Sequence, residues 1–402
     1  MHRFRSVVGS ARVRSFGLLA LAGLVLSGCA MSLDGDTPQT TLEPEGPAAS
    51  KIDGLSDLTF IIAAVVFVLV EVGVLFVAWK FRKRKDDTGD ELPEQLHGNT
   101  KLEIGWTALP AVILAFLAVF TVSTILDLAE DPGEEATRIR VVGQQWWWSY
   151  DYDLDGDGVY ADGDVVAPGI ENPEEYETDI EVANEMVIPA GKPVYLEIES
   201  RDVIHSFWIP ALNGKKDAVP GRTHYLSLEA DEPGTYVGQC TEYCGLSHAY
   251  MRMVVHALPE DEYEAWVEEQ LAPANEPETA EEQAGLEVFE GRCASCHLVE
   301  GVNDDTYDGA TVVPGAAPNL THFASRGTYA GSIFNLWQDT NGNDVIEWAE
   351  IGGELNRNQL EAWLRNPPAE KPMAADENRG MPNLGLSEAD IDSLVAYLTS
   401  LD

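Results

Sequence analysis

Two long apolar runs constrain this chain more than any other feature of its sequence. They cover residues 58–79 and 104–126 and contain almost only apolar side chains. A helix needs about 20 such residues to cross a bilayer, and a backbone in hydrocarbon must satisfy its own hydrogen bonds. We therefore predict a transmembrane helical hairpin over residues 58–126. Glu71 in the first run should face a partner helix or be protonated, and Pro110 in the second needs neighbours that satisfy the freed carbonyl.

The segment between the two runs fixes the orientation of the hairpin. It begins with the basic stretch Lys-Phe-Arg-Lys-Arg-Lys at residues 80–85. Short loops rich in Lys and Arg stay in the cytoplasm. Both outer ends of the hairpin should then emerge on the other side, which predicts a multi-pass protein of a bacterial plasma membrane with its remaining domains on the outer face.

The first 29 residues have the parts of an export signal. Four arginines precede an apolar run at residues 16–26, and small residues lead to Cys29. The ending Leu-Ser-Gly-Cys29 resembles a bacterial lipobox, which implies cleavage before Cys29 and a lipid on it. A plain signal peptide or an uncleaved first helix is the alternative. Residues 30–57, with much Pro, Thr and Gly, are predicted to form a tether.

The charge of the chain limits its partners. Lys and Arg number 25 against 68 Asp and Glu, for a formal net charge of -43, which argues against nucleic-acid binding. The acidic surface suits either docking of a cationic donor protein or life at high external salt. We favour the second, because at roughly 1 M salt the screening length is only about 3 Å.

A twelve-residue stretch gathers soft metal ligands. Cys240, Cys244, His248 and Met251 follow one another at spacings of 4, 4 and 3, and thiolate, thioether and imidazole are ligands that copper selects. A mononuclear copper site needs only one cysteine. Two cysteines can bridge a pair of metal ions, and such a pair requires a second histidine ligand. His205 supplies it. A disulfide between the cysteines is the alternative, and it leaves the other three residues unexplained.

This stretch resembles the binuclear copper (CuA) site of cytochrome c oxidase subunit II. The resemblance implies that Cys240 and Cys244 are bridging thiolates and that His205 and His248 are terminal imidazole ligands. It implies that Met251 and the backbone carbonyl of Glu242 are weak ligands. It also implies that the Glu242 carboxylate binds magnesium or manganese at the boundary with subunit I.

Two further stretches carry the same resemblance. Residues 143–152 hold an aromatic cluster in which Trp146 matches the tryptophan that the family places at the surface over the copper, where electrons arrive. Gln144 stands where the family often has histidine. Glu103, at the start of the second apolar run, matches a glutamate at the mouth of a proton pathway; an ordinary interfacial acid is the alternative.

Residues 136–260 are predicted to form a cupredoxin-like all-β barrel or sandwich. Short runs such as 194–199 and 224–228 alternate apolar and polar side chains, as strands with one face on a core do. His224 and His256 are predicted to be ordinary strand residues. Beyond Pro259 an acidic helix and a Pro/Glu-rich segment form a linker over residues 261–280.

Residues 281–402 are predicted to be an all-α class I cytochrome c domain. Cys293-Ala-Ser-Cys296-His297 is the attachment signature for c-type haem, and a zinc knuckle would need a second ligand pair. The resemblance implies a methionine as the sixth iron ligand, and Met381, followed by proline shortly before the last helix, is preferred to Met373.

Smaller signals support this domain. The carbonyl of Pro318 is expected to accept the Nδ1 proton of His297 and fix its tautomer. Ser387 and Asp390 resemble a capping box at the start of the last helix. His322 is predicted to lie at the surface or near a haem propionate rather than to bind iron.

Two acidic stretches approach the calcium-loop pattern. The first lacks the final glutamate and the second lacks the glycine at position 6, and acidic turns without metal are the alternative. The candidate ligands are Asp153, Asp155, Asp157 and Asp164 in the first stretch and Asp339, Asn341, Asn343 and Glu350 in the second.

Together the motifs resemble subunit II of a caa-type cytochrome c oxidase. That resemblance implies electron flow from haem c to CuA and on to haem a in subunit I, where oxygen is reduced to water and protons are pumped. The implied partners are subunits I and III, membrane lipid and an upstream donor, which could be a cytochrome, a high-potential iron-sulfur protein or a respiratory complex. The alternatives are the input subunit of a nitric oxide reductase and a free-standing membrane-anchored electron carrier. A quinol oxidase subunit would lack the copper ligands.

Overall fold

The computed structural model describes residues 39–82, 97–133, 136–154, 180–303, 317–375 and 379–402. The predicted lipid anchor at Cys29 lies outside the described residues. So do Asp155, Asp157 and Asp164 of the first acidic loop.

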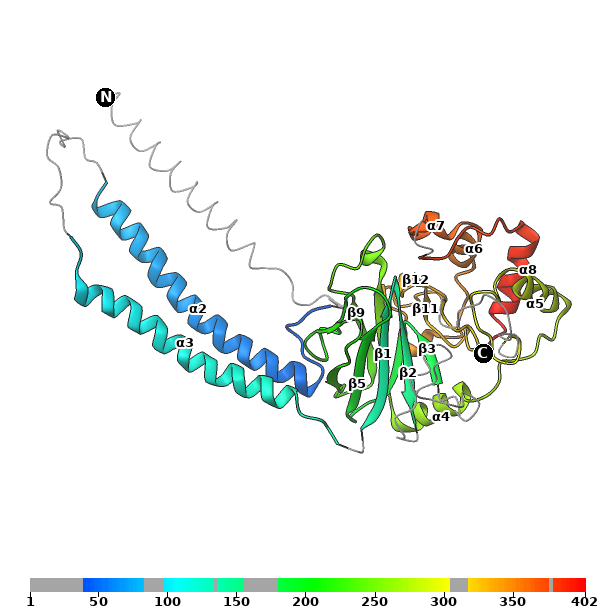
Figure 1. The fold of residues 1–402 in the computed structure, drawn as a ribbon, viewed down its shortest axis with the longest axis horizontal. Helices are drawn as coiled ribbons and strands as arrows, with labels where there is room; N and C mark the ends of the chain where they lie inside the picture. The colour runs from blue at the N-terminus through cyan, green and yellow to red at the C-terminus, as the bar shows by residue number, and fades with distance from the viewer. Residues whose placement is uncertain (1–38, 83–96, 134–135, 155–179, 304–316, 376–378) are drawn as a thin grey trace, which may run out of the picture. The chain divides into compact units, whose positions relative to one another are not determined.

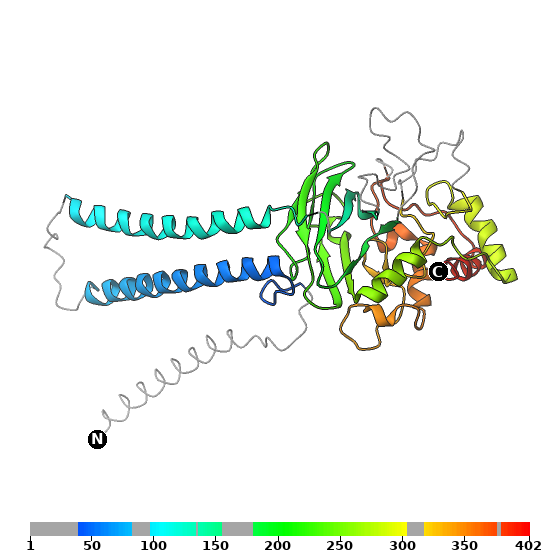
Figure 2. The same ribbon diagram turned by 90° about the horizontal axis from the view of Figure 1, so that it is seen from below.

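The two apolar runs form long helices that lie side by side (Figures 1 and 2), and both are long and apolar enough to cross a membrane. Helix α2 spans Pro47–Lys80 and α3 spans Thr100–Leu128. Residues 47–57 are thus helical, and the prediction that they belong to a tether is wrong. Proline suits the first helical position, and Ala49 N bonds to Leu212 O at 3.2 Å, which ties the start of α2 to the β domain.

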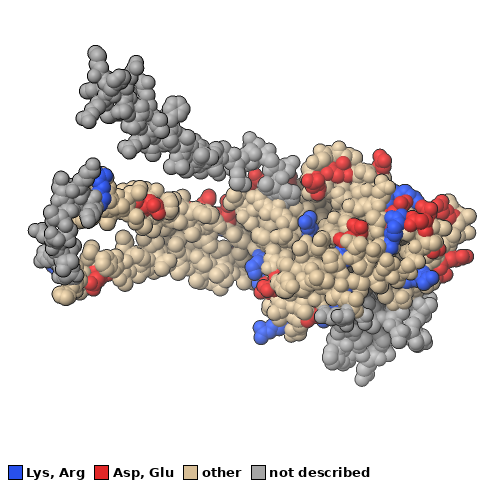
Figure 3. Space-filling model, turned by 90° about the horizontal axis from the view of Figure 1, so that it is seen from above, with Lys and Arg blue, Asp and Glu red and all other residues tan. Residues whose placement is uncertain are grey.

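Charged side chains are distributed as a membrane protein requires. Figure 3 shows the length of the hairpin as mostly uncharged surface, with charges gathered near its ends and over the outer domains. Asn99 caps α3 by accepting a hydrogen bond from Leu102 N at 3.2 Å. Glu103 lies in the first turn, where its Oε1 accepts from Asn99 N at 3.2 Å.

The β domain packs a five-stranded sheet, in the order β3-β2-β1-β5-β8, against a three-stranded sheet in the order β4-β10-β9. Strand β1 pairs antiparallel with β2 and parallel with β5, and β10 pairs antiparallel with β9 and parallel with β4. The architecture is the predicted cupredoxin-like one. The strands are β1 Thr137–Gln144, β2 Trp147–Asp153, β3 Ile180–Ala183, β4 Glu185–Pro189, β5 Val194–Ser200, β6 His205–Phe207, β7 Lys216–Ala218, β8 His224–Leu228, β9 Gly234–Gln239 and β10 Arg252–Leu258.

Burial along the strands follows their position. Strand β5 alternates buried and partly exposed residues, as one core-facing side predicts, whereas every residue of β2 is buried. The acidic helix expected after Pro259 is α4, Glu260–Gln270. Its Trp266 packs on Tyr152 of β2 with ring centroids 5.2 Å apart.

The C-terminal domain is mainly helical, with one short hairpin. Its first and last helices, α5 and α8, cross so closely at Gly285 that an added Cβ would lie 2.1 Å from the carbonyl oxygen of Ser393. Both helices begin with a capping box, and the one at Ser387 is as predicted. The elements are α5 Ala280–Arg292, β11 Thr328–Tyr329, β12 Phe334–Asn335, α6 Arg357–Arg365, α7 Pro367–Glu370 and α8 Glu388–Leu398.

Candidate metal centre

Five of the six predicted copper ligands lie in the loop that joins β9 to β10, and the sixth, His205, begins the short strand β6. The two strands are antiparallel with Arg252 opposite Gln239, and Cys240 N donates to the carbonyl oxygen of Met251 at 2.9 Å. This bond closes the loop at its ends. The side chains of the residues between are therefore held by two paired strands of the sandwich.

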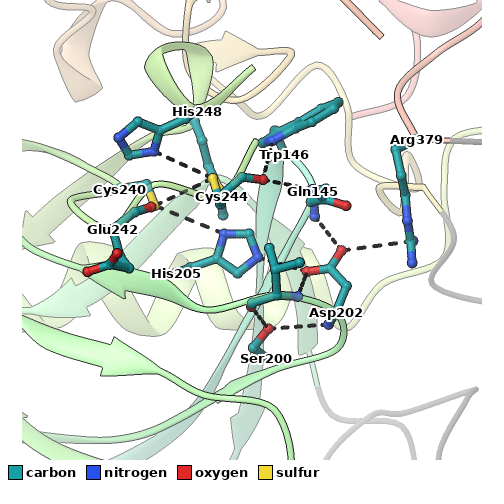
Figure 4. Close-up of polar contacts among 12 residues, drawn as sticks. Gln145, Trp146, Ser200, Asp202, His205, Cys240, Glu242, Cys244, His248 and Arg379 are labelled. Atoms are coloured by element: carbon teal, nitrogen blue, oxygen red, sulfur yellow. Dashed lines mark hydrogen bonds and ion pairs between the residues drawn. The ribbon is translucent and has the colours of Figure 1, made fainter. Parts of the chain in front are cut away.

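The two cysteine side chains face each other at the centre of this loop (Figure 4). Cys240 and Cys244 are buried free thiols with their sulfurs 3.9 Å apart. A disulfide bond is about 2.05 Å long. The structure thus shows a thiol pair and not the alternative of a disulfide.

Each sulfur has its own imidazole. Nδ1 of His205 lies 4.0 Å from Sγ of Cys240, and Nδ1 of His248 lies 3.5 Å from Sγ of Cys244. The ligand atoms of His205 and both cysteines all lie within 4.8 Å of one another. Asp202 Oδ1 contacts the second nitrogen of His205, Nε2, at 2.8 Å, and such a partner orients a metal-binding imidazole.

The two weak ligands complete the set. Sδ of Met251 lies 3.8 Å from Sγ of Cys244, and the carbonyl oxygen of Glu242 lies 3.3 Å from Sγ of Cys240. The structure therefore brings all six predicted ligands together. Soft sulfur and imidazole donors in a buried cluster fit a copper pair.

The electrostatics of the cluster favour metal binding. A hydrogen bond from Cys244 lowers the pKa of Cys240 to about 4, with further help from His205, although burial opposes this. The same bond and burial raise the pKa of Cys244. Burial alone would lower the pKa of His205, but its bonds to Asp202 and Cys240 raise it. One proton therefore stays with the cysteine pair, and metal binding must displace it.

Trp146 contacts the cluster directly but is not at the surface. Its indole Nε1 donates to the carbonyl oxygen of Cys244 at 3.0 Å, and only 2% of the residue is exposed. The expectation of a surface position is wrong because the C-terminal domain covers this tryptophan. Lys371 Nζ donates to its carbonyl oxygen at 2.7 Å. Neighbouring Gln144 is buried, and its amide nitrogen has no partner among the described residues.

The haem-attachment residues lie where α5 ends. Cys293 is the C-cap of α5, and His297 Nδ1 lies 2.8 Å from the carbonyl oxygen of Pro318, as predicted. This contact leaves Nε2 for a metal. Burial lowers the pKa of His297, which favours the neutral imidazole that binds iron. Met381 and Met373 are both partly buried, and the choice of Met381 as sixth ligand stays a prediction.

Buried polar groups of the C-terminal domain fit a large polar-edged cofactor. The hydroxyl of Tyr329 and Nε of Arg326 are buried, and the described residues offer them no hydrogen-bond partner. Haem carries carboxylates that accept such bonds. His322 is 5% exposed, so it does not lie at the surface, and the alternative place near a haem propionate stays a prediction.

One buried pair was not singled out from the sequence. His256 lies in β10 as predicted, but its Nε2 is 3.6 Å from Oε2 of Glu185 in the parallel neighbour β4. His224 lies in β8 as predicted. The alternation of apolar and polar residues along a strand does not reveal a buried Glu–His pair, because the pairing depends on the register of β4 with β10.

One backbone feature of the second acidic loop matches the calcium-loop pattern. Asp344, at position 6, has φ +62°, the conformation that glycine usually supplies there. Two of the candidate ligand side chains accept hydrogen bonds from backbone amides of the loop. Asp339 Oδ1 accepts from Gly342 N at 2.6 Å, and Glu350 Oε1 accepts from Thr340 N at 2.8 Å. Of the first loop's candidates only Asp153 is described, buried at the end of β2.

The fold and the two sites define a membrane-anchored electron-transfer protein that joins a sulfur-histidine metal centre to a c-type cytochrome. The chain is 35% identical over 390 residues to "Cytochrome c oxidase subunit 2" of Alkalihalophilus pseudofirmus, with 95% of each chain covered. It belongs to the cytochrome c oxidase subunit II family, whose members are parts of a haem-copper oxidase. The subunit II domain implies CuA as a cofactor, and the cytochrome c domain implies haem c.

Other comparisons agree domain by domain. The families that match are "Cytochrome C oxidase subunit II, transmembrane domain" at residues 42–124, its "periplasmic domain" at 137–258 and "Cytochrome c" at 282–402. The subunit 2 of Bacillus sp. strain PS3 is 30% identical over 409 residues, with 98% of each chain covered. A crystal structure of the periplasmic domain of subunit II from Bradyrhizobium japonicum is 34% identical and covers 35% of this chain and 95% of its own, with a TM-score of 0.27.

Proposed function

We propose that this chain is the electron-input subunit of a proton-pumping cytochrome c oxidase. Electrons would reach haem c, pass by way of Trp146 to the copper centre and continue to haem a in subunit I, where oxygen is reduced. The observation that carries the proposal is the pair of thiols 3.9 Å apart with one imidazole Nδ1 beside each sulfur. A single-copper site or a structural disulfide has no use for this arrangement.

The roles of the residues follow from their positions. Cys240 and Cys244 would bridge two copper ions, with His205 and His248 as terminal ligands. When bound, the copper pair and haem c each take up and release one electron. The chain supplies rigidity: the loop is closed between paired strands, and Asp202 fixes the His205 ring. A fixed ligand frame lowers the rearrangement that accompanies each electron transfer.

The surface around the copper loop suits subunit I. Large apolar side chains beside the ligands are exposed in this chain alone, among them Tyr243 at 76%, Leu246 at 59% and Ile204 at 44%. Such patches mark protein interfaces. The carboxylate of Glu242 is exposed and points away from the sulfurs (Figure 4), so it is free to bind magnesium or manganese shared with subunit I.

The remaining assignments concern the membrane and the partners. The structure's two apolar helices and the family's outer-face domain support a place in a bacterial plasma membrane. Cys29 would be the lipid anchor, and this rests on the lipobox-like sequence Leu-Ser-Gly-Cys29. Glu103, at the start of α3, would lead protons toward subunit I. Subunit III and an upstream donor, whether a cytochrome, an iron-sulfur protein or a respiratory complex, complete the proposed assembly.

Calcium binding by the acidic loops is a separate proposal. The positive φ of Asp344 at position 6 supports it for the second loop, where Asp339, Asn341, Asn343 and Glu350 would be ligands. Calorimetry on the purified protein should show heat on addition of calcium at about millimolar levels, the range of extracellular sites. No heat in wild type, or equal heat in Glu350→Ala, would remove the loop from consideration.

Purification from membranes with redox spectroscopy tests the main proposal. We expect haem a to co-purify, oxygen to be consumed, and Cys244→Ser to lose the copper signal while keeping haem c. Turnover of nitric oxide in place of oxygen would assign the chain to a nitric oxide reductase. Copper and haem c without any large subunit would favour a free-standing carrier.

A further inference from the structure

The C-terminal domain touches the two groups that support the copper ligands. Lys371 Nζ donates to the carbonyl oxygen of Trp146 at 2.7 Å, and the indole of Trp146 in turn donates to Cys244. Arg379 Nη1 lies 3.9 Å from Oδ2 of Asp202, the carboxylate that holds His205, and Figure 4 shows this arginine reaching toward it. Two basic side chains of the C-terminal domain thus each contact a residue of the β domain that is itself hydrogen-bonded to a predicted copper ligand.

Backbone contacts beside Lys371 show that the two domains meet closely. Arg252 N donates to Gly331 O at 2.9 Å, and Lys371 Nζ also donates to the carbonyl oxygen of Ala330 at 2.8 Å. Gly331 has φ +83°, and an added Cβ would lie 2.6 Å from the carbonyl oxygen of Tyr250 and 3.1 Å from that of Trp146. Only glycine permits this approach.

A second anchor lies on the neighbouring part of the β domain. The carboxylate of Glu185 in β4 accepts hydrogen bonds from Gly327 N, at 2.8 Å, and from the hydroxyl of Thr328. His256 lies on the other side of the Glu185 carboxylate, and the buried guanidinium of Arg326 is attracted to the same carboxylate. The segment from Gly327 to Gly331 is therefore held at both ends by the β domain.

We propose that these contacts are a permanent docking interface, in which Lys371 and Glu185 are positioning residues that hold the haem domain over Trp146. Electron input at Trp146 is thereby reserved for the chain's own haem, and a separate donor protein must dock on the C-terminal domain instead. The inference rests on the proposed function for the identity of the metal centres. The interface itself rests only on this chain's contacts.

Permanent docking is not the default for a tethered domain. Contacts between domains of one chain usually resemble transient interfaces, so relative motion is expected unless specific contacts oppose it. Here the Glu185 carboxylate accepts from an amide and a hydroxyl across the interface, and such charge-assisted bonds are stronger than neutral ones. Lys371 adds two bonds to backbone carbonyls from a buried amine, whose pKa burial lowers to about 7. The contacts at both ends of the segment restrict rotation as well as separation.

The test compares wild-type oxidase with Lys371→Met, which keeps the length of the side chain but removes its donors. Amide hydrogen exchange at residues 145–148 and 328–332 should become about tenfold faster or more, since two hydrogen bonds across the interface are lost. Electron transfer from haem c to copper after flash reduction should slow. Lys192→Met, which removes an exposed lysine paired with Glu260, should change neither.

A second pair of variants tests the interface without relying on Lys371. Gly331→Ala meets backbone in the interface, whereas Gly352→Ala has a similar positive φ of +76° with nothing within 4 Å of the added Cβ. Both carry the same local strain, so only the first should speed exchange at residues 145–148. If Lys371→Met fails to fold, this pair decides.

The outcomes separate the interface from the proposed function. Normal copper and haem spectra with faster exchange and slower transfer in Lys371→Met and Gly331→Ala support the interface. Normal spectra with wild-type exchange and transfer in both variants overturn it and leave the oxidase assignment intact. Direct reduction of copper by an added soluble cytochrome, before haem c, would also overturn it. Missing copper in the wild type would instead refute the proposed function, while the exchange comparison would still judge the interface.

Discussion

Asp202 and His205 are bonded through Oδ1 and Nε2 at 2.8 Å, which turns Nδ1 of the imidazole toward the cysteine pair. The carboxylate also accepts from Gln145 N at 2.8 Å and Val203 N at 2.7 Å, so it cannot rotate freely. The position of one copper ligand is thus set by a residue that is not itself a ligand.

Replacing Asp202 by Asn should weaken copper binding without removing a ligand. Loss of such a partner typically costs about 10–100-fold in metal affinity. Competition with a copper chelator, followed by copper absorption, measures the change. Asp231→Asn makes the same change at an exposed acid and should behave as wild type. Equal affinity in Asp202→Asn would show that the ring is held by packing alone.

Trp146→Phe should slow electron transfer between the metal centres while leaving both of them loaded. The change removes the indole donor to the carbonyl oxygen of Cys244, 3.0 Å away, and shortens a ring that lies beside Gly245 of the loop and Gly380 of the C-terminal domain. Flash reduction of haem c with detection at copper gives the rate. Trp266→Phe, at a buried tryptophan of the same core, is the control, and an equal rate in Trp146→Phe would exclude the indole from the route.

Two glycines of α5 should respond in opposite ways to the same substitution. Gly285→Ala places a Cβ 2.1 Å from Ser393 O and should destabilise the C-terminal domain by about 1–3 kcal/mol. Gly291→Ala meets nothing within 4 Å and should be neutral or stabilising by up to about 1 kcal/mol. Thermal unfolding followed by haem absorption measures both. A stable Gly285→Ala would mean that α5 and α8 can move apart.

Acid should loosen the contact at Glu185. Burial alone would raise its pKa, but His256, Thr328 and Gly327 together lower it below the usual 4.5. A carboxylate with a lowered pKa contributes stability above the unfolded value, and this is lost as the pH falls below about 4.5.

Glu185→Gln should therefore flatten the acid side of the stability curve. The variant should lose about 1–3 kcal/mol at neutral pH and show less further loss below pH 4.5. Thermal unfolding and amide exchange at residues 327–332 between pH 7 and pH 3.5 provide the measurement. Glu260→Gln, at an exposed acid, is the control. Parallel curves for Glu185→Gln and wild type would contradict the assignment.

The sequence predicted what depends on short-range pattern. The ligands from Cys240 to Met251 and the haem signature at Cys293–His297 lie close together in the chain, so spacing alone revealed them. His205 was found because the metal pair lacked an imidazole. The helical hairpin followed from composition, although α2 begins at Pro47 because the helix continues beyond its apolar part.

What the sequence did not predict depends on contacts between distant segments. Lys371 and Arg379 lie in a segment without a regular pattern, and only the folded chain brings them to Trp146 and Asp202. For the same reason Trp146 was expected at the surface. Glu185 stands in an ordinary strand, and its role appears only when the C-terminal domain is in place.

The thiol pair has a consequence for the assembly of the protein. The sulfurs of Cys240 and Cys244 lie 3.9 Å apart, and closing to a bond of about 2.05 Å requires only a small shift of the sulfurs. The domain matures outside the cytoplasm, where oxidants favour disulfides. Copper binding and disulfide formation therefore compete for the same two thiols during maturation. A chain in which the disulfide forms first needs a reductant before it can bind copper.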